Sequence, residues 1–171
     1  MPNTEEQSQI AYASLNSPIG RLTILADDKG ITEIRFPNNS HVLPSSPSST
    51  GQASEYVERA IDQLQAYFDG HLKDFDLPLS LGGTDFQQGV WAQLQTVRYG
   101  TTASYGQIAA AINKPKAARA VGMANNKNRI PIVIPCHRII GSNGSLTGFA
   151  GGLDTKRWLL AHEASASGRA L

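Results

Sequence analysis

Short apolar runs separated by turn residues dominate the first third of the chain. Residues 12–15, 21–26 and 31–36 are rich in β-formers and predict three strands. Asp27-Asp28-Lys29-Gly30 lies between the last two runs and predicts a hairpin turn. The sequence therefore starts with a small antiparallel sheet.

The pattern then changes to a helical period. Residues 37–54 are rich in Ser, Pro and Asn and predict an exposed loop. Over residues 55–69 apolar side chains recur every three or four positions, up to a stop at Gly70: Val57, Ile61, Leu64 and Phe68. One amphipathic helix is expected to follow the strands.

Two capping boxes mark helices in the second half. Thr84 with Gln87 opens one helix, and Ser104 with Gln107 opens a shorter one. A third helix is predicted over residues 117–125 and carries Arg119. Two short helices with a tight turn between them fit a DNA-binding helix-turn-helix and also an ordinary packing hairpin.

The last third of the chain is irregular in its pattern. Residues 130–138, with their two prolines, predict a short buried strand, and Asn143-Gly144 predicts a hairpin turn. A glycine-rich loop over 147–152 leads into a final helix over 154–163, which is expected to bury Trp158 and Leu159.

Composition bounds the class of protein. The 171 residues are 40% hydrophobic and 17% charged, which allows a packed core. The N-terminus is polar and the longest apolar run is far too short for a membrane span, so we expect a soluble protein. The single cysteine excludes an internal disulfide and zinc sites with two or more thiolates.

Charge divides the chain in two. Residues 1–80 hold five basic and eleven acidic residues, a net charge of −6. Residues 81–171 hold ten basic and three acidic residues, a net charge of +7. We predict a support domain over 1–80 and, over 81–171, a domain that could face a polyanion such as DNA.

The lone cysteine is the candidate nucleophile. Cys136 follows Pro135 at the predicted strand end, next to His137. Arg138 and Arg119 are expected near the thiol, where positive charge would lower the thiol pKa. Glu163 could orient the histidine and complete a nucleophile, base and orienter set. Adjacent residues on a strand point to opposite faces, so Cys136 and His137 would need a bend or a bridging water.

The stretch 134–140, Ile-Pro-Cys-His-Arg-Ile-Ile, resembles the active-site signature of the O6-alkylguanine-DNA alkyltransferase family. The resemblance extends in family order over residues 84–163. It includes Tyr105, Arg119-Ala120-Val121-Gly122, Asn128, Gly148-Phe149-Ala150-Gly151-Gly152, Lys156 and His162-Glu163. The implied fold is α+β, with an N-terminal ribonuclease-H-like sheet-plus-helix domain and a C-terminal, mostly helical, winged-helix-like domain.

The resemblance implies direct DNA repair. An alkyl group would pass irreversibly from O6 of guanine, and less readily from O4 of thymine, to Cys136. His137 would act as base through a water, and Glu163 would orient it. Tyr105 would donate to the departing guanine, and Lys156 and Asn128 would support the site. No metal or cofactor is expected, and the protein would act once.

The resemblance also implies how DNA is bound. The target nucleotide would be flipped out of the duplex, with Arg119 filling its space from the minor groove. Small residues would allow the close approach of this helix, with Tyr105 beside it: Ala118, Ala120 and Gly122. The protein is expected to be a cytoplasmic monomer that associates with the nucleoid when it acts; cooperative binding along DNA is left open.

Several positions depart from the family pattern and bear on the alkyl groups accepted. Arg129 follows Asn128 where proline is frequent, Phe149 replaces a tyrosine, and Ala150 replaces a serine found in some members. These changes predict a smoother, more apolar pocket that accepts larger alkyl groups. The expected pocket wall consists of Asn125, Pro131, Val133, Ile139, Phe149 and Ala150.

Three alternatives remain at this point. A lesion-binding relative without transfer activity would replace the cysteine, which Cys136 argues against. A helix-turn-helix alkylation sensor would carry a further metal-binding domain. A cysteine–histidine hydrolase would leave the Arg119 helix unexplained.

Overall fold

The computed structural model describes residues 9–168, which divide into two compact units at the boundary between Leu81 and Gly82. The first unit is a three-stranded antiparallel sheet in the order β1-β2-β3, with β1 at Ala11–Ser17, β2 at Gly20–Ala26 and β3 at Ile31–Arg35. All three predicted strands are present, and the predicted hairpin turn joins β2 to β3.

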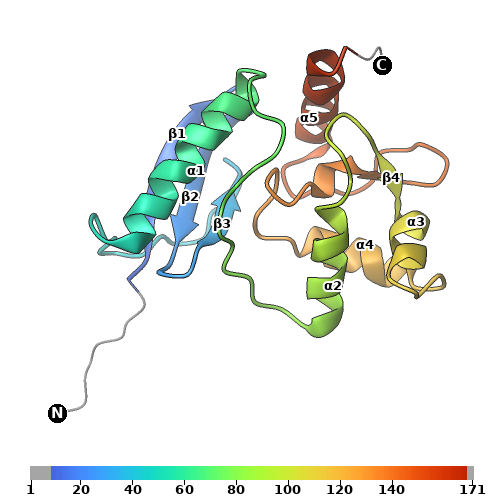
Figure 1. Cartoon of the computed structure of the whole chain (residues 1–171), viewed down its shortest axis with the longest axis horizontal. Helices are drawn as coiled ribbons and strands as arrows, with labels where there is room; N and C mark the ends of the chain where they lie inside the picture. Colours follow the sequence, from blue (N-terminus) through green and yellow to red (C-terminus); the bar gives the residue numbers. More distant parts are fainter. Residues whose placement is uncertain (1–8, 169–171) are drawn as a thin grey trace. The chain divides into compact units, whose positions relative to one another are not determined.

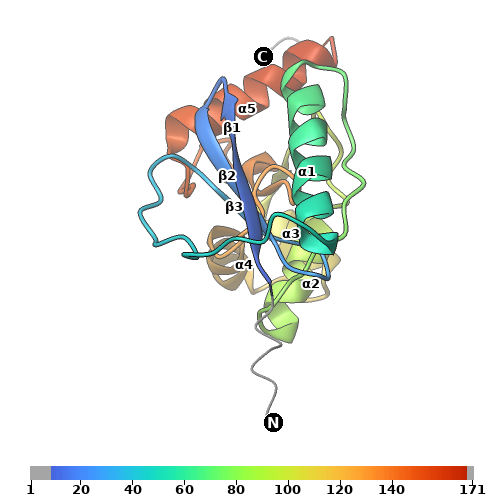
Figure 2. The ribbon, with the colours of Figure 1, turned by 90° about the vertical axis from the view of Figure 1, so that its left-hand side faces the viewer.

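Helix α1, Gln52–Phe68, lies along one face of this sheet (Figures 1 and 2). Leu22 and Ile24 of β2 are fully buried, and so are Ala60 and Leu64 of α1. Their alternation on the strand and helical spacing on α1 give this unit its own core. The helix covers nearly the residues that its period predicts.

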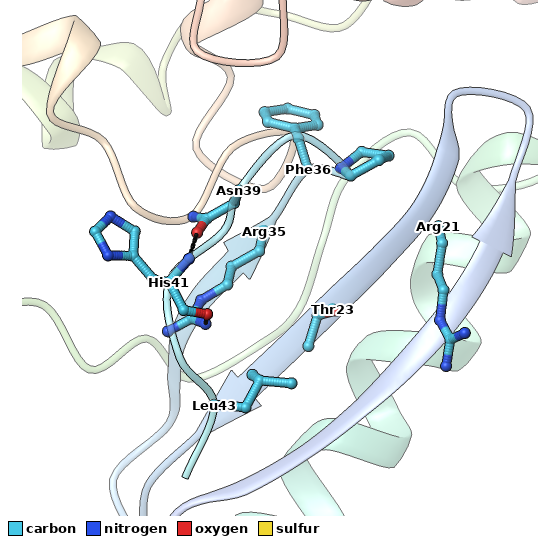
Figure 3. A pocket seen from close by; sticks show the side chains of 8 residues that line it. Arg21, Thr23, Arg35, Phe36, Asn39, His41 and Leu43 are labelled. Carbon is cyan, nitrogen blue, oxygen red and sulfur yellow. Dashed lines mark hydrogen bonds between the residues drawn. The ribbon is translucent and has the colours of Figure 1, made fainter.

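The other side of β2 carries polar residues beneath the loop over 36–43. Arg35 of β3 holds this loop, because its Nη1 donates to the His41 carbonyl at 3.0 Å while its Nε lies 3.1 Å from Glu33 Oε1. Figure 3 shows the resulting cavity of about 190 Å³, with Arg21 and Thr23 beside it. The Arg35 guanidinium is thus engaged in closing the loop onto the sheet.

Three helices pack together in the second unit: α2 at Asp85–Leu94, α3 at Tyr105–Ala111 and α4 at Ala118–Asn126 (Figure 1). Both predicted capping boxes are formed, at Thr84–Gln87 and at Ser104–Gln107. The Trp91 indole donates to the Ala124 carbonyl at 2.8 Å and ties α2 to α4. This contact was not apparent from the periodic positions alone.

The remaining elements of the second unit are short, apart from the last helix. Strands β4, Ala103–Ser104, and β5, Ile139–Ile140, pair in parallel. Helix α5, Leu153–Ala166, buries Leu159 and Glu163 but leaves Trp158 half-exposed, stacked on His162. The expected burial of Leu159 is confirmed, whereas Trp158 is only half-buried because its ring stacks on His162 of the same helix.

The predicted strand over 130–138 is absent. Residues 136–138 instead form a 3-10 turn, η1, and the preceding residues form two tight turns. The Asn143-Gly144 turn is present, closed by Gly144 N–H to the Gly141 carbonyl, but no strand follows it. Proline at 131 and 135 removes two ladder donors, so an extended run cannot be held by a neighbour.

Candidate active site

The loop before Cys136 is made of two three-residue turns. Val133 N–H donates to the Pro131 carbonyl at 2.9 Å around Ile132, whose φ is +74°. Cys136 N–H donates to the Ile134 carbonyl at 2.7 Å around Pro135. A positive φ at a β-branched residue is strained by roughly 1–3 kcal/mol, so the surroundings must hold it.

Asn128 is the residue that holds this loop. Its Oδ1 accepts from Ile130 N–H at 3.0 Å, and its Nδ2 donates to the Ile134 carbonyl at 2.9 Å. Both ends of the strained turn are therefore bound by one nearly buried side chain. The predicted supporting role of Asn128 has a direct geometric basis in these two bonds.

The 3-10 turn η1 places Cys136 and His137 in the interior. Their exposed fractions are 4% and 0%. The expected obstacle, that neighbours on a strand face opposite ways, does not arise because the backbone here is not a strand. The 3-10 turn is the bend that the sequence analysis expected between Cys136 and His137.

His137 and Glu163 form a buried pair, with Nε2 2.7 Å from Oε2. Burial opposes ionisation of Glu163, but hydrogen bonds from His137 and Arg138, together with the positive charge of Arg138, outweigh it and hold the carboxyl pKa well below its usual range. An ionised carboxylate can only accept, so Nε2 carries the proton and Nδ1 keeps its lone pair. Nδ1 has no hydrogen-bond partner within residues 9–168.

Burial also lowers the pKa of His137, more than the Glu163 carboxylate raises it. The imidazole is therefore neutral near pH 7, with Nδ1 available to take a proton. The three-residue set predicted from sequence thus has the base and the orienter in contact.

Arg138 does not act on the thiol as expected. Its Nε donates to Glu163 Oε1 at 2.8 Å, its Nη2 to Glu163 Oε2 at 3.0 Å, and its Nη1 to the Val97 carbonyl at 2.7 Å. Arg119 is exposed on α4. The expectation that these arginines lower the thiol pKa is wrong for Arg138, whose guanidinium serves the carboxylate.

The thiol is more basic than ordinary cysteine. Burial raises the pKa of Cys136 to about 11, although a hydrogen bond from the Asn128 side chain and the charge of Lys156 lower it in part. Cys136 is thus a neutral thiol at rest, and a reaction must remove its proton. The neutral His137, next to Cys136 in the same buried turn and with Nδ1 unpartnered within residues 9–168, is the candidate base.

Lys156 of α5 is fully buried and has two carbonyl partners. Its Nζ donates to Ile139 at 2.6 Å and to Thr147 at 3.1 Å. Burial lowers its pKa, and the Cys136 thiolate would raise it. The lysine joins β5 to the glycine-rich loop and is the cation whose charge acts on Cys136.

Tyr105, the first residue of α3, lies 2.8 Å from Thr147 through the two hydroxyl oxygens. It lines a cavity of about 490 Å³ between α3, α4 and the 141–148 loop. The expected DNA-binding residues Ala118, Arg119 and Gly122 line the same cavity, whereas Ala120 is exposed outside it. The other lining residues are Gly106, Asn126, Gly141, Ser142, Thr147 and Gly148.

The expected pocket-wall residues do not line this cavity. Pro131 and Ile139 are buried, and the Asn125 amide, 2% exposed, lies 3.5 Å from the Cys136 carbonyl. Val133 and Phe149 are half-buried and Ala150 is exposed. Their contact with a substrate stays a prediction.

The exposed ridge of α4 adds two residues that sequence reasoning missed, Met123 and Asn126, to the expected Arg119. Arg119, Met123 and Asn126 follow one another at helical spacing, and Met123 is 69% exposed. The sequence could have indicated this, because Met123 follows Arg119 by four positions and so lies on the same face of the helix. Exposed cations occur before and after this helix: Lys114, Lys116, Lys127 and Arg129.

Within residues 9–168, no group of three or more His, Cys, Asp or Glu side chains could hold a metal ion. No helix in the same part of the chain is long and apolar enough to cross a membrane.

Comparisons with known proteins point to one family. The family model "6-O-methylguanine DNA methyltransferase, DNA binding domain" matches residues 85–165, and its "ribonuclease-like domain" counterpart matches residues 10–81. A methylated-DNA–protein-cysteine methyltransferase of Methanosarcina acetivorans is 47% identical over 154 residues, covering 90% of this chain and 98% of the relative. That of Mycolicibacterium paratuberculosis is 49% identical, covering 90% and 92%.

Solved structures agree with these sequence matches. The crystal structure of Mycobacterium tuberculosis OGT in complex with DNA superposes with a TM-score of 0.83 at 46% identity, covering 91% of this chain and 94% of that one. The α+β fold described above is therefore shared with that structure.

Proposed function

Because the chain belongs to the 6-O-methylguanine DNA methyltransferase family, we propose that it repairs duplex DNA by transferring the alkyl group of O6-alkylguanine to its own Cys136. The observation that carries this proposal is the buried Cys136–His137–Glu163 set, with the only cysteine of the chain at its head. O4-alkylthymine is a second, slower substrate.

The transfer is a displacement at the alkyl carbon. His137 Nδ1 takes the thiol proton through a water, and the sulfur electron pair forms the new S–C bond. The C–O6 bond breaks with its electron pair on guanine, which then takes up one proton. Tyr105, whose hydroxyl lies 2.8 Å from Thr147 Oγ1 in the lining of the cavity, supplies that proton.

Proton transfer to the imidazole explains how a thiol with a pKa of about 11 can react. The proton passes from sulfur to imidazole inside the protein, so no thiolate need exist beforehand. Glu163 stabilises the resulting imidazolium, and the Lys156 ammonium stabilises the thiolate. A thiolate desolvated in this way is a strong nucleophile.

DNA binds at the α4 ridge. Arg119, Met123 and Asn126 enter the minor groove, with small Ala118, Ala120 and Gly122 permitting close approach. Arg119 fills the space of the flipped nucleotide, which enters the cavity toward the thiol. The basic residues around α4 bind phosphates without sequence preference.

The product is a thioether, which no second cysteine can resolve. The protein is therefore spent after one turnover. Residues 81–171 carry binding and transfer, because every residue of the site lies there, and residues 1–80 support them. The protein acts as a monomer in the cytoplasm and associates with the nucleoid when it repairs DNA. The reaction uses no cofactor.

A titration tests the proposal. Duplex DNA containing O6-methylguanine, in increasing excess, should lose one methyl group per protein and no more. Cys136→Ser should bind the same duplex and remove none. A lesion-binding protein without transfer activity would show binding with no methyl loss in the unsubstituted chain, and catalytic turnover beyond one would indicate a different mechanism.

A further inference from the structure

Thr147 lies between two residues to which we assign roles in the reaction. Its Oγ1 is 2.8 Å from Tyr105 Oη, and its carbonyl accepts from Lys156 Nζ at 3.1 Å. The residue sits on the glycine-rich loop, after the Gly141–Ser145 turn. One residue thus contacts both the phenol and the buried cation.

The two contacts differ in kind. Lys156 is bound by the backbone of Thr147, whereas Tyr105 is bound by its side chain. Any residue at 147 can supply the carbonyl, but only a hydroxyl can reach the phenol oxygen. Substitution of the side chain therefore separates the two contacts.

Resting on the proposed function, we infer that Thr147 is a positioning residue: its hydroxyl donates to Tyr105 Oη and directs the phenol O–H at the departing guanine. The assignment of the donor follows from the chemistry. Tyr105 must give its own proton to the base, so the bond to Thr147 must be one that Tyr105 accepts. The same donor then stabilises the phenolate that remains.

The proton balance is closed by the residues already described. The thiol proton goes to His137, and the phenol proton goes to guanine. Imidazolium and phenolate are left, and proton exchange with solvent returns both to neutrality. Thr147 keeps its own proton throughout.

The location of Thr147 favours this role over a purely structural one. It is exposed and lines the cavity with Tyr105, so its hydroxyl is not needed to satisfy a buried group. On the other side, Tyr105 packs near Gly122 of α4, where a Cβ would stand 3.7 Å from the ring. Helix α4 thus fixes the position of the Tyr105 ring, and Thr147 fixes the orientation of its hydroxyl.

The test is a double-mutant cycle in the full chain, with single-turnover transfer from O6-methylguanine duplex as the rate. Thr147→Val should slow transfer about tenfold, the value of one hydrogen bond, while the DNA Kd stays within about twofold. Thr147→Ser should restore the rate. Tyr105→Phe should slow transfer at least as much as Thr147→Val.

The decisive variant combines Thr147→Val with Tyr105→Phe. If Thr147 acts through the phenol, the double variant should be no slower than Tyr105→Phe alone. Additive losses, or a Thr147→Ser variant as slow as Thr147→Val, would overturn the inference. If the unsubstituted protein gains no alkyl group on Cys136, the proposed function itself fails, which is a separate result.

Discussion

Arg138 binds both carboxylate oxygens of Glu163 with one edge of its guanidinium, through Nε at 2.8 Å and Nη2 at 3.0 Å. The same carboxylate accepts from His137 and, at 3.3 Å, from Gly100 N–H. Glu163 is therefore fixed as an anion in the interior. This arrangement sets the tautomer of the histidine, and with it the base for the thiol.

Glu163→Gln should impair both folding and transfer. Breaking a buried ion pair leaves Arg138 uncompensated and costs roughly 3–5 kcal/mol. Loss of the anionic acceptor removes the stabilisation of the imidazolium, so the transfer rate should fall by about 10²–10⁴. Urea unfolding and single-turnover kinetics measure the two effects.

Arg138→Lys is the matched control for that variant. It keeps the charge and the His137–Glu163 bond but loses the bidentate hydrogen bond from Nε and Nη2 to the carboxylate. Stability should fall while most of the transfer rate remains. Equal rate losses in the two variants would mean that Glu163 serves the fold alone.

Replacing Arg119 with alanine should slow repair of duplex DNA about 10- to 100-fold, because nothing then fills the space of the flipped nucleotide. Reaction with free O6-benzylguanine should change much less, since no base pair has to open. Lys116→Ala is the control and should weaken duplex binding uniformly, with a shallower salt dependence. Equal losses of Arg119→Ala on both substrates would refute the finger role.

The pH dependence of transfer separates His137 from simple ionisation of the thiol. Proton transfer from thiol to neutral imidazole gives a rate that is level at neutral pH and falls on the acid side, with a midpoint below the ordinary 6.5 because burial lowers the pKa of His137. Free ionisation toward a pKa of about 11 would instead raise the rate about tenfold per pH unit. A rising profile from neutral to alkaline pH would exclude the histidine as base.

Stability should fall in alkali because of Cys136. Burial raises the folded-state pKa to about 11, above the ordinary 9.0, so between these values the folded chain keeps a proton that the unfolded chain releases. The resulting loss of stability is at most roughly 2–3 kcal/mol. Cys136→Ala lacks this group and should lose less stability over the same range, as thermal denaturation would show; parallel curves would mean that the thiol is solvated.

Much of this fold can be predicted from local sequence patterns. The three strands and α1 follow from alternation and helical period, and the boxes at Thr84 and Ser104 fix where α2 and α3 begin. The candidate site residues Cys136, His137 and Glu163 stand out in the sequence because they carry chemistry that ordinary packing does not need. The family resemblance then assigned each of them a role in the reaction.

The backbone around the thiol could not be predicted in the same way. Residues 130–138 have the composition of a strand, but their positive φ at Ile132 is imposed by Asn128 from outside the run. The partner of Arg138 was missed for a similar reason, because the carboxylate it binds lies 25 residues away. Such choices depend on tertiary contacts, which no local window contains.

The most direct test of the account is mass spectrometry of the intact protein and its peptides after mixing with one equivalent of duplex DNA that contains O6-methylguanine. The account predicts one added methyl group, located on the peptide that holds Cys136, and no further gain with fresh DNA. Tight binding without a mass change, or a methyl group on any other residue, would contradict it.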